Sequence, residues 1–218
     1  MTASLQKKII PLGVPSLGMP LVLGIASVKD GVKMPMVNAT IEDCHKFGLL
    51  HDAVAIVLFD MKDNVLLVLR SRKKFGGGKW EIPATHCFGS GYFPDGYRCL
   101  EDEVGVKDVN LDYLGDFHYC VHVGDLIENE IVHVLIAEYD GLVRPNQEHC
   151  MDFAWFPLSQ IFNDGFTVEA SRKFGYAQWS HEGIKAMFDK VCEYIDKKRG
   201  RISFSEGFAS AKSSGRTF

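Results

Sequence analysis

The sequence predicts an α+β protein in which helices cover a sheet, arranged as an α/β/α sandwich. Apolar runs at 53–59 and 65–69 flank a polar turn, which indicates a buried hairpin. Further strands are expected at 113–123, 130–139 and 152–156, with helices at 98–106 and 183–198 between and after them. Strands clustered around helices in this order are typical of that fold class.

The chain of 218 residues fits one domain with extensions. We expect an N-terminal extension at 1–20, the folded domain at 21–199, and a basic Ser/Gly-rich tail at 200–218. The net charge of -4 gives no support for nucleic-acid binding, and no apolar run is long enough to span a membrane. The six cysteines form no CxxC pair and no signal peptide is recognisable. These features favour a cytoplasmic protein with reduced thiols.

The remaining elements follow from local signals. A short strand is expected at 21–28, before the Asp30-Gly31 turn, and Thr40 has the character of an N-cap for a short helix that contains His45. Gly124-Asp125 is expected to join the two long strands, and Pro157 to open a helix.

The segment 98–106 reads as an amphipathic helix that ends at Gly105. At 3.6 residues per turn, Cys99, Asp102 and Glu103 are expected to share a face. Two neighbouring acids repel each other, and a hard cation such as Mg²⁺ would relieve that repulsion.

Another pair of acids stands in Glu128-Asn129-Glu130. In a strand, the period of two puts both carboxylates on one face, where they could hold a divalent ion or transfer a proton. Two solvated surface acids are the alternative. His45, His51 and His86 would add imidazole ligands, which suit Zn²⁺ or Mn²⁺ better than Mg²⁺, although a single histidine is more often simply packed or exposed.

Three further features carry possible chemistry. Cys87 follows His86, so it is either a reactive thiol or a buried structural cysteine. Basic residues that include Arg70 and Lys74 surround Gly76-Gly77-Gly78 and form either a diphosphate clamp or a solvated loop. Trp179 offers an aromatic face to a cation, or else core packing.

The helix segment resembles the end of the Nudix box. Asp102 is a conservative replacement in it, whereas Ala84, Ser90 and Cys99 stand where the box has a glycine and two acids, so the box is degenerate. The positions that match the box are Arg98, Leu100, Glu103, Gly105 and Val106.

The order of all these features along 22–187 resembles type I isopentenyl-diphosphate isomerase, a branch of the Nudix superfamily. Its most specific pieces are 127–131 and 151–155, with Trp179 beyond them. The resemblance implies a Nudix-type sandwich with a mixed central sheet. It also implies an enzyme that rearranges a prenyl diphosphate by protonation and deprotonation through a carbocation.

The resemblance also implies roles for individual residues. The diphosphate would carry Mg²⁺ held by Glu103, and a second ion, Zn²⁺ or Mn²⁺, would lie at a His/Glu site. The implied metal ligands are His45, His51, His86, Glu103, Glu128 and Glu130. The implied catalytic residues are Cys87, Glu130, Tyr119 and Trp179. The implied diphosphate-binding residues are Arg70, Lys74 and Arg98.

The sequence departs from this pattern in the loop before the box. The isomerase loop reads Cys-x-His, whereas here His86 precedes Cys87. Two alternatives therefore stay open: a Nudix hydrolase of a nucleoside or other diphosphate, and a non-catalytic Nudix module that binds a ligand. The most informative observation is whether His45, His51, His86, Glu128 and Glu130 converge in space, since a His86 that points away from the two glutamates would argue against isomerase chemistry.

Overall fold

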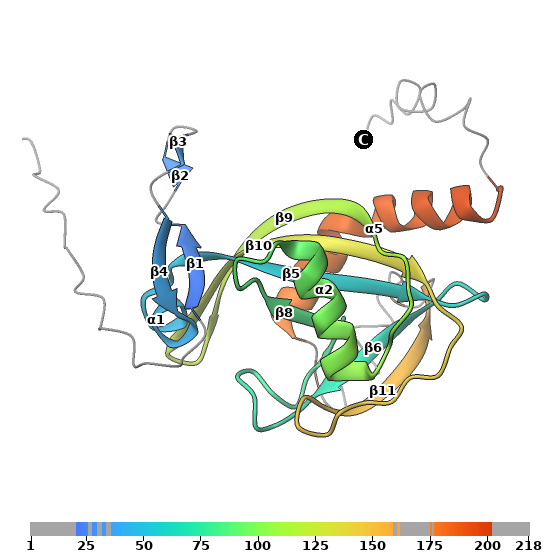
Figure 1. Cartoon of the computed structure of the whole chain (residues 1–218), viewed down its shortest axis with the longest axis horizontal. Helices are drawn as coiled ribbons and strands as arrows, with labels where there is room; N and C mark the ends of the chain where they lie inside the picture. Colours follow the sequence, from blue (N-terminus) through green and yellow to red (C-terminus); the bar gives the residue numbers. More distant parts are fainter. Residues whose placement is uncertain are drawn as a thin grey trace, which may run out of the picture.

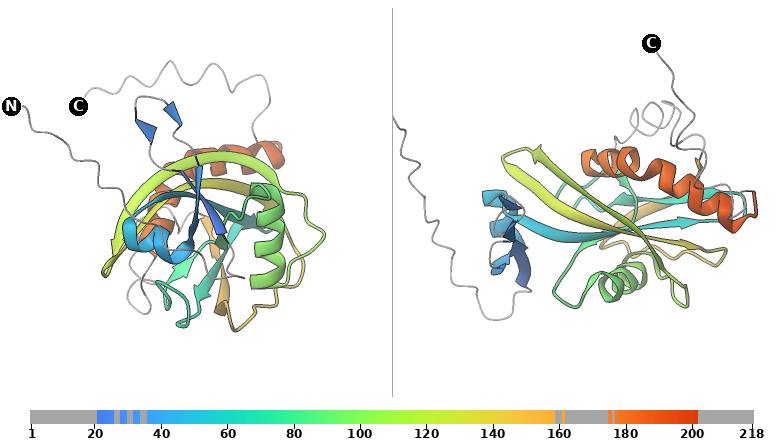
Figure 2. Two further views of the ribbon diagram at one scale, coloured as in Figure 1. Left: turned by 60° about the vertical axis from the view of Figure 1, so that its left-hand side comes forward. Right: turned by 90° about the horizontal axis from the view of Figure 1, so that it is seen from above.

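The computed structural model describes residues 21–25, 28–29, 32–33, 36–158, 161, 175 and 177–201. A mixed sheet of nine described strands forms the centre of the molecule (Figure 1). Helix α5 (Gln178–Lys198) covers one face, and helix α2 (Tyr92–Cys99) covers the other (Figure 2). The expected α+β sandwich with a mixed sheet is confirmed. The expected N-terminal extension, and the tail beyond Arg201, lie outside the described residues.

The sheet is mixed because one pair of long neighbouring strands runs in the same direction. Strand β5 (Leu50–Phe59) pairs in parallel with β10 (Leu126–Glu138), and the other pairings in the sheet are antiparallel. The other strands of this sheet are β1 (Leu21–Ile25), β4 (Met36–Thr40), β6 (Asn64–Arg70), β7 (Trp80–Glu81), β8 (Ala84–His86), β9 (Asp112–Val123) and β11 (Cys150–Pro157). A separate two-stranded sheet joins β2 (Val28–Lys29) and β3 (Val32–Lys33).

The apolar run in β5 is continuous because both faces of the sheet are covered. Ala53 and Val57 pack on the face under α5, whereas Val54 and Ile56 pack on the face under α2. These two clusters form two cores, one on each side of the sheet. A residue of the central strands therefore faces either α5 or α2 according to its parity.

Helix α1 (Ile41–Phe47) begins as expected at Thr40, whose hydroxyl accepts a hydrogen bond from the backbone N–H of Asp43 at 3.1 Å. It ends at Gly48 in the left-handed conformation, with φ of 62°. This short helix brings His45 beside the start of β5, where His51 lies.

The helix expected at 98–106 begins earlier, at Tyr92, and finishes in a π-helical turn, η1 (Leu100–Val104), that ends at Gly105. The expectation that Cys99, Asp102 and Glu103 share one face is wrong for Asp102. Cys99 and Glu103 are buried, whereas the side chain of Asp102 is 52% exposed. A π turn holds more residues than an α turn, so it shifts the faces that the α period predicts.

Helix α5 also begins earlier than expected and therefore carries Trp179 in its first turn. It lies very close to β9, because a Cβ at Gly183 would stand 2.5 Å from the ring of Phe117. The helix expected to open at Pro157 lies mostly outside the described residues.

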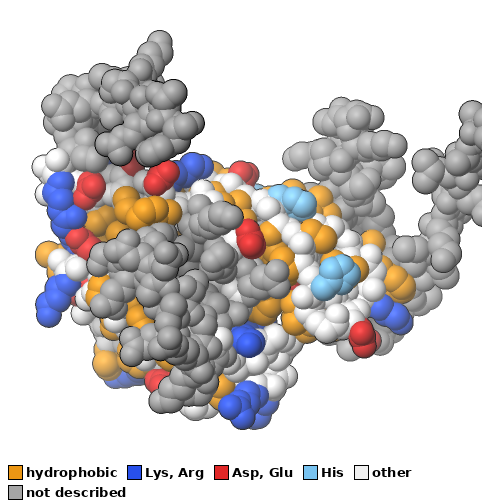
Figure 3. Space-filling model, turned by 180° about the vertical axis from the view of Figure 1, so that it is seen from behind, with side chains coloured by type: hydrophobic (Ala, Val, Ile, Leu, Met, Phe, Trp, Pro, Cys, Tyr) orange, Lys and Arg blue, Asp and Glu red, His pale blue; other side chains and the backbone are white. Residues whose placement is uncertain are grey.

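Charged side chains of both signs lie on the described surface. On the face shown in Figure 3, the described Lys and Arg side chains are interspersed with Asp and Glu. Among the described residues, no helix has the length and apolar character needed to cross a membrane.

Candidate active site

Three histidines and two glutamates meet at one end of the parallel strand pair. The ligand atoms of His45, His51, His86 and Glu128 all lie within 4.8 Å of one another. His45 Nε2 is 3.4 Å from Glu128 Oε1, and the Nε2 atoms of His51 and His86 are 3.3 and 3.2 Å from Glu130 Oε1. The structure therefore brings together five of the six predicted metal ligands.

Strand register explains this convergence. Glu130 of β10 lies beside His51 of β5 and, on its other side, beside Tyr119 of β9. His86 of β8 lies beside Ala53, two residues beyond His51. Since alternate residues of a strand face the same side, Glu128 joins Glu130 as the sequence predicted.

The ligand atoms are held in orientations that suit a cation. His51 Nδ1 lies 2.8 Å from the carbonyl oxygen of Leu49, so it donates there and directs Nε2 into the cluster. Asn129 donates to the carbonyl of Gly48 at 2.9 Å and so fixes the end of α1 against β10. Buried His51 Nε2 and Glu128 Oε2 have no hydrogen-bond partner, which is the condition that a bound divalent ion relieves. The mixed imidazole and carboxylate donors fit Zn²⁺ or Mn²⁺.

The buried groups of the cluster have pKa values that are shifted in different directions. Burial lowers the pKa of His45 to about 4, with the neighbouring His86 and His51 adding to the effect. It raises the pKa of Glu128 to about 9, with repulsion from Glu130 as the second cause. Burial would raise the pKa of Glu130, but the close imidazoles of His51 and His86 outweigh it and hold that pKa well below the usual range. Glu130 is therefore ionised in the resting site.

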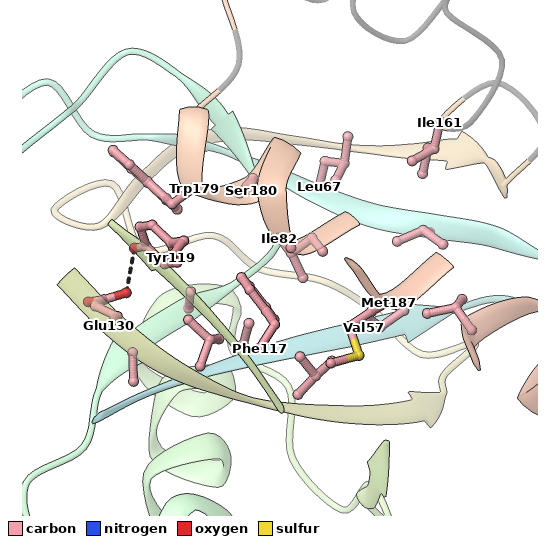
Figure 4. Close-up of a pocket in the computed structure, with 18 of the residues that line it drawn as sticks. Val57, Leu67, Ile82, Phe117, Tyr119, Glu130, Ile161, Trp179, Ser180 and Met187 are labelled. Atoms are coloured by element: carbon pink, nitrogen blue, oxygen red, sulfur yellow. Dashed lines mark hydrogen bonds between the residues drawn. The ribbon is translucent and has the colours of Figure 1, made fainter. Parts of the chain in front are cut away.

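Glu130 has a second partner that the sequence suggested. The hydroxyl of Tyr119 donates to Glu130 Oε2 at 2.5 Å, and both side chains are buried (Figure 4). Burial, together with the charge of Glu130, raises the pKa of Tyr119, so the phenol keeps its proton. One carboxylate thus touches both the metal ligands and a phenol.

An open chamber of about 520 Å³ lies beside the cluster, and all three predicted diphosphate-binding residues line it or its rim. Lys74 Nζ lies 2.9 Å from Glu103 Oε1, at the edge of this chamber. The second oxygen of Glu103 is buried without a hydrogen-bond partner, so it is free to hold a cation. Glu103 does not belong to the histidine cluster.

Arg98 and Arg70 line the chamber but already have protein partners. Arg98 forms an ion pair with Asp95 at 3.0 Å and donates to the carbonyl of His86 at 3.2 Å, which fixes the end of β8. Arg70 donates to Glu81 at 2.8 Å and to the carbonyl of Phe75 at 2.7 Å.

Glu81 is a residue of this site that the sequence did not single out. It is 1% exposed and accepts hydrogen bonds from Arg70 and, at 2.8 Å, from the indole N–H of Trp179. The indole is enclosed further by Gly76, where a Cβ would stand 2.3 Å from the ring. Glu81 therefore sets the position of the aromatic wall.

Cys87 does not join the other predicted residues. Its side chain packs on the α2 face of the sheet with Val54 and Ile56, and burial raises the pKa of the thiol to about 12. Strand parity is the reason, since His86 faces the α5 side and the next residue faces away. Two residues before His86, Ala84 lines the chamber between Glu130 and Trp179. This placement argues against the predicted catalytic thiol.

The model of the NUDIX domain family matches residues 49–177, more than half of the chain. The chain therefore belongs to the Nudix family. A crystal structure of DR0079 from Deinococcus radiodurans has the same fold, with a TM-score of 0.58, 10% identity, and coverage of 76% of this chain and 98% of that chain.

Within the family, the chain is similar to proteins named for one activity. It is 30% identical over 173 residues to isopentenyl-diphosphate Delta-isomerase of Jannaschia sp. (strain CCS1), covering 72% of this chain and 93% of the relative. It is 29% identical over 168 residues to isopentenyl-diphosphate Delta-isomerase 1 of Aromatoleum aromaticum, covering 73% and 87%. The expected isomerase-like Nudix enzyme is thereby confirmed at the level of family and class.

Proposed function

We propose that the protein is a divalent-metal-dependent enzyme that moves a double bond in a prenyl diphosphate, by adding a proton at one carbon and removing one at another. The observation that carries this proposal is the position of Glu130. It touches His51, His86 and Tyr119 on one side and lines an apolar hollow on the other. A carboxylate at such a boundary suits proton transfer to and from a hydrocarbon.

The binding of substrate divides between two regions. Arg70, Lys74 and the chamber rim take the diphosphate, and Glu103 holds the Mg²⁺ that accompanies it. His45, His51, His86, Glu128 and Glu130 hold the second divalent ion, Zn²⁺ or Mn²⁺. When bound, these ions neutralise the negative charges of the phosphates and of the carboxylates.

The hydrocarbon lies against Trp179, Tyr119 and Glu130. The hydroxyl of Tyr119 gives its proton to the double bond and leaves a tertiary carbocation, which the indole face and the carboxylate of Glu130 stabilise in an apolar pocket. Glu130 then accepts the proton from the neighbouring carbon and passes it to the Tyr119 phenolate through their hydrogen bond, which restores both groups. We assign this chemistry to the Glu130–Tyr119 pair and not to Cys87, whose thiol lies on the opposite face.

Hydrolysis of a nucleoside diphosphate is the weaker alternative. It needs several acids on the box helix to hold ions and activate water, and in this chain Cys99 is 1% exposed and Asp102 faces solvent. Glu103 is the acid of that turn that pairs with Lys74, a residue of the chamber wall.

Incubation of the protein with Mg²⁺, Mn²⁺ and isopentenyl, dimethylallyl or geranyl diphosphate tests the proposal. The expected products are isomers that retain the diphosphate, identified by NMR. Release of phosphate from nucleoside diphosphates, with no change in any prenyl diphosphate, would favour the hydrolase instead. A protein that binds ligands but converts none of them would support the binding module.

A further inference from the structure

A second, apolar hollow continues inward from the charged chamber. The two share part of their walls, at Ala53, Ala84, Tyr119, Glu130 and Trp179. Figure 4 shows Tyr119, Glu130 and Trp179 together at one end of this inner hollow. The inner hollow therefore begins at Glu130, the carboxylate to which we assign the proton transfer.

The inner hollow runs between the sheet and α5. Its floor follows alternate residues of two neighbouring strands, Ala53 and Ala55 of β5 and Glu130, Val132 and Val134 of β10. At a strand rise of about 3.3 Å per residue, the four residue steps from Glu130 to Val134 span about 13 Å. An extended five-carbon unit has four carbon–carbon bonds of about 1.5 Å and advances by about 5 Å. The hollow is thus longer than one such unit.

Small side chains keep this space open. Ala53, Ala55 and Ala84 lie on adjacent strands, and Ala55 is paired with Ala84. Val57 and Met187 continue the walls farther in (Figure 4). The cavity measures about 60 Å³.

We propose that the inner hollow binds a hydrocarbon tail, so that the preferred substrate is a prenyl diphosphate of at least ten carbons. This inference rests on the function proposed above, because the diphosphate must lie in the charged chamber. The reacting double bond lies beside Glu130, and the additional isoprene unit extends under α5 between Ala55 and Met187. An apolar tail there replaces water against walls that are almost wholly hydrocarbon.

The first test compares isopentenyl, dimethylallyl and geranyl diphosphates as substrates of the full chain in D₂O with Mg²⁺ and Mn²⁺. We expect deuterium to enter the ten-carbon compound with a kcat/KM at least tenfold higher than that of either five-carbon compound, because a single buried methylene is worth about tenfold or more. Equal or faster exchange in the five-carbon compounds would overturn the tail site and leave the proposed function intact.

If none of the compounds exchanges deuterium, the proposed function fails. Calorimetric binding of geranyl and dimethylallyl diphosphates then decides the tail site separately. Tighter binding of geranyl diphosphate by at least tenfold supports it, and equal binding overturns it.

The second test fills the hollow. In Ala55→Leu, we expect kcat/KM for the ten-carbon compound to fall at least tenfold relative to the five-carbon compounds. The control Ala154→Leu makes the same change at a partly buried alanine of β11 outside the hollow, and we expect it to leave the ratio unchanged. Val134→Ala enlarges the hollow and should shift preference toward a fifteen-carbon compound, which keeps the test decisive if Ala55→Leu does not fold. Unchanged ratios in both hollow variants would contradict the proposal.

Discussion

Replacement of Glu81 by alanine tests how much the buried Arg70–Glu81 ion pair contributes to stability. The side chain of Arg70 is 14% exposed and pairs with Glu81 at 2.8 Å. Burial would lower the pKa of Arg70, but the attraction of Glu81 outweighs it and raises that pKa, so the guanidinium stays charged. Removal of one partner of a buried ion pair costs about 3–5 kcal/mol. We expect Glu81→Ala to lower the free energy of unfolding by about that amount.

For a chain of this size, each kcal/mol shifts Tm by about 2–4 °C, so the expected fall in Tm is about 6–20 °C. Urea unfolding followed by circular dichroism measures the free energy. Glu81→Gln keeps an acceptor for the indole of Trp179 and should lose less stability. Glu101→Ala replaces an exposed acid, and its free energy of unfolding should stay within about 0.5 kcal/mol of the wild-type value. Equal stability of Glu81→Ala and Glu101→Ala would refute the reasoning.

Three further predictions concern other parts of the molecule. Cys87→Ala should keep kcat/KM for a prenyl diphosphate within about twofold, and a loss of about a hundredfold or more, the scale of an acid–base group, would restore the thiol as a catalyst. His51→Ala should weaken Zn²⁺ or Mn²⁺ binding by about 10–100-fold in calorimetric titration. The control His122→Ala, at an exposed histidine, should leave the affinity unchanged. Equal metal affinities of the two variants would show that the proposed cluster is not a metal site. Asp63→Asn should reduce stability at pH 7 and reduce it by less at pH 3. Hydrogen bonds from Arg201 and Arg199 outweigh partial burial and lower the pKa of Asp63. A lowered carboxyl pKa contributes stability above the unfolded value of about 3.9, and that stability is lost as the pH falls; a difference that persisted undiminished at pH 3 would contradict this.

The parts of the fold that the sequence predicted are those with strong local signals. The apolar runs of β5 and β6 locate the hairpin, and Thr40 locates the start of α1. The period of two in Glu128-Asn129-Glu130 indicated that both carboxylates face the same side, which the structure confirms.

The phase of a strand or helix is harder to predict. His86 and Cys87 are adjacent, and only the pairing of β8 with β5 decides which of them faces the site, because a shift of one residue reverses every side chain. Asp102 was misplaced for a similar reason, since the π turn changes the helical period. Glu81 was missed because its partner Trp179 lies 98 residues away in the sequence. No local sequence pattern therefore indicates that this charge is buried.

The most direct test of the central claim is deuterium uptake by a prenyl diphosphate in D₂O, compared between the wild type and Glu130→Gln with Mg²⁺ and Mn²⁺ present. Glu101→Gln is the matched control, and the stability of each variant is measured to confirm that it is folded. We predict uptake by the wild type and the control, and a loss of at least a hundredfold in Glu130→Gln, the scale of a missing acid–base group. Uptake that survives in a folded Glu130→Gln variant would contradict the assignment of proton transfer to this carboxylate.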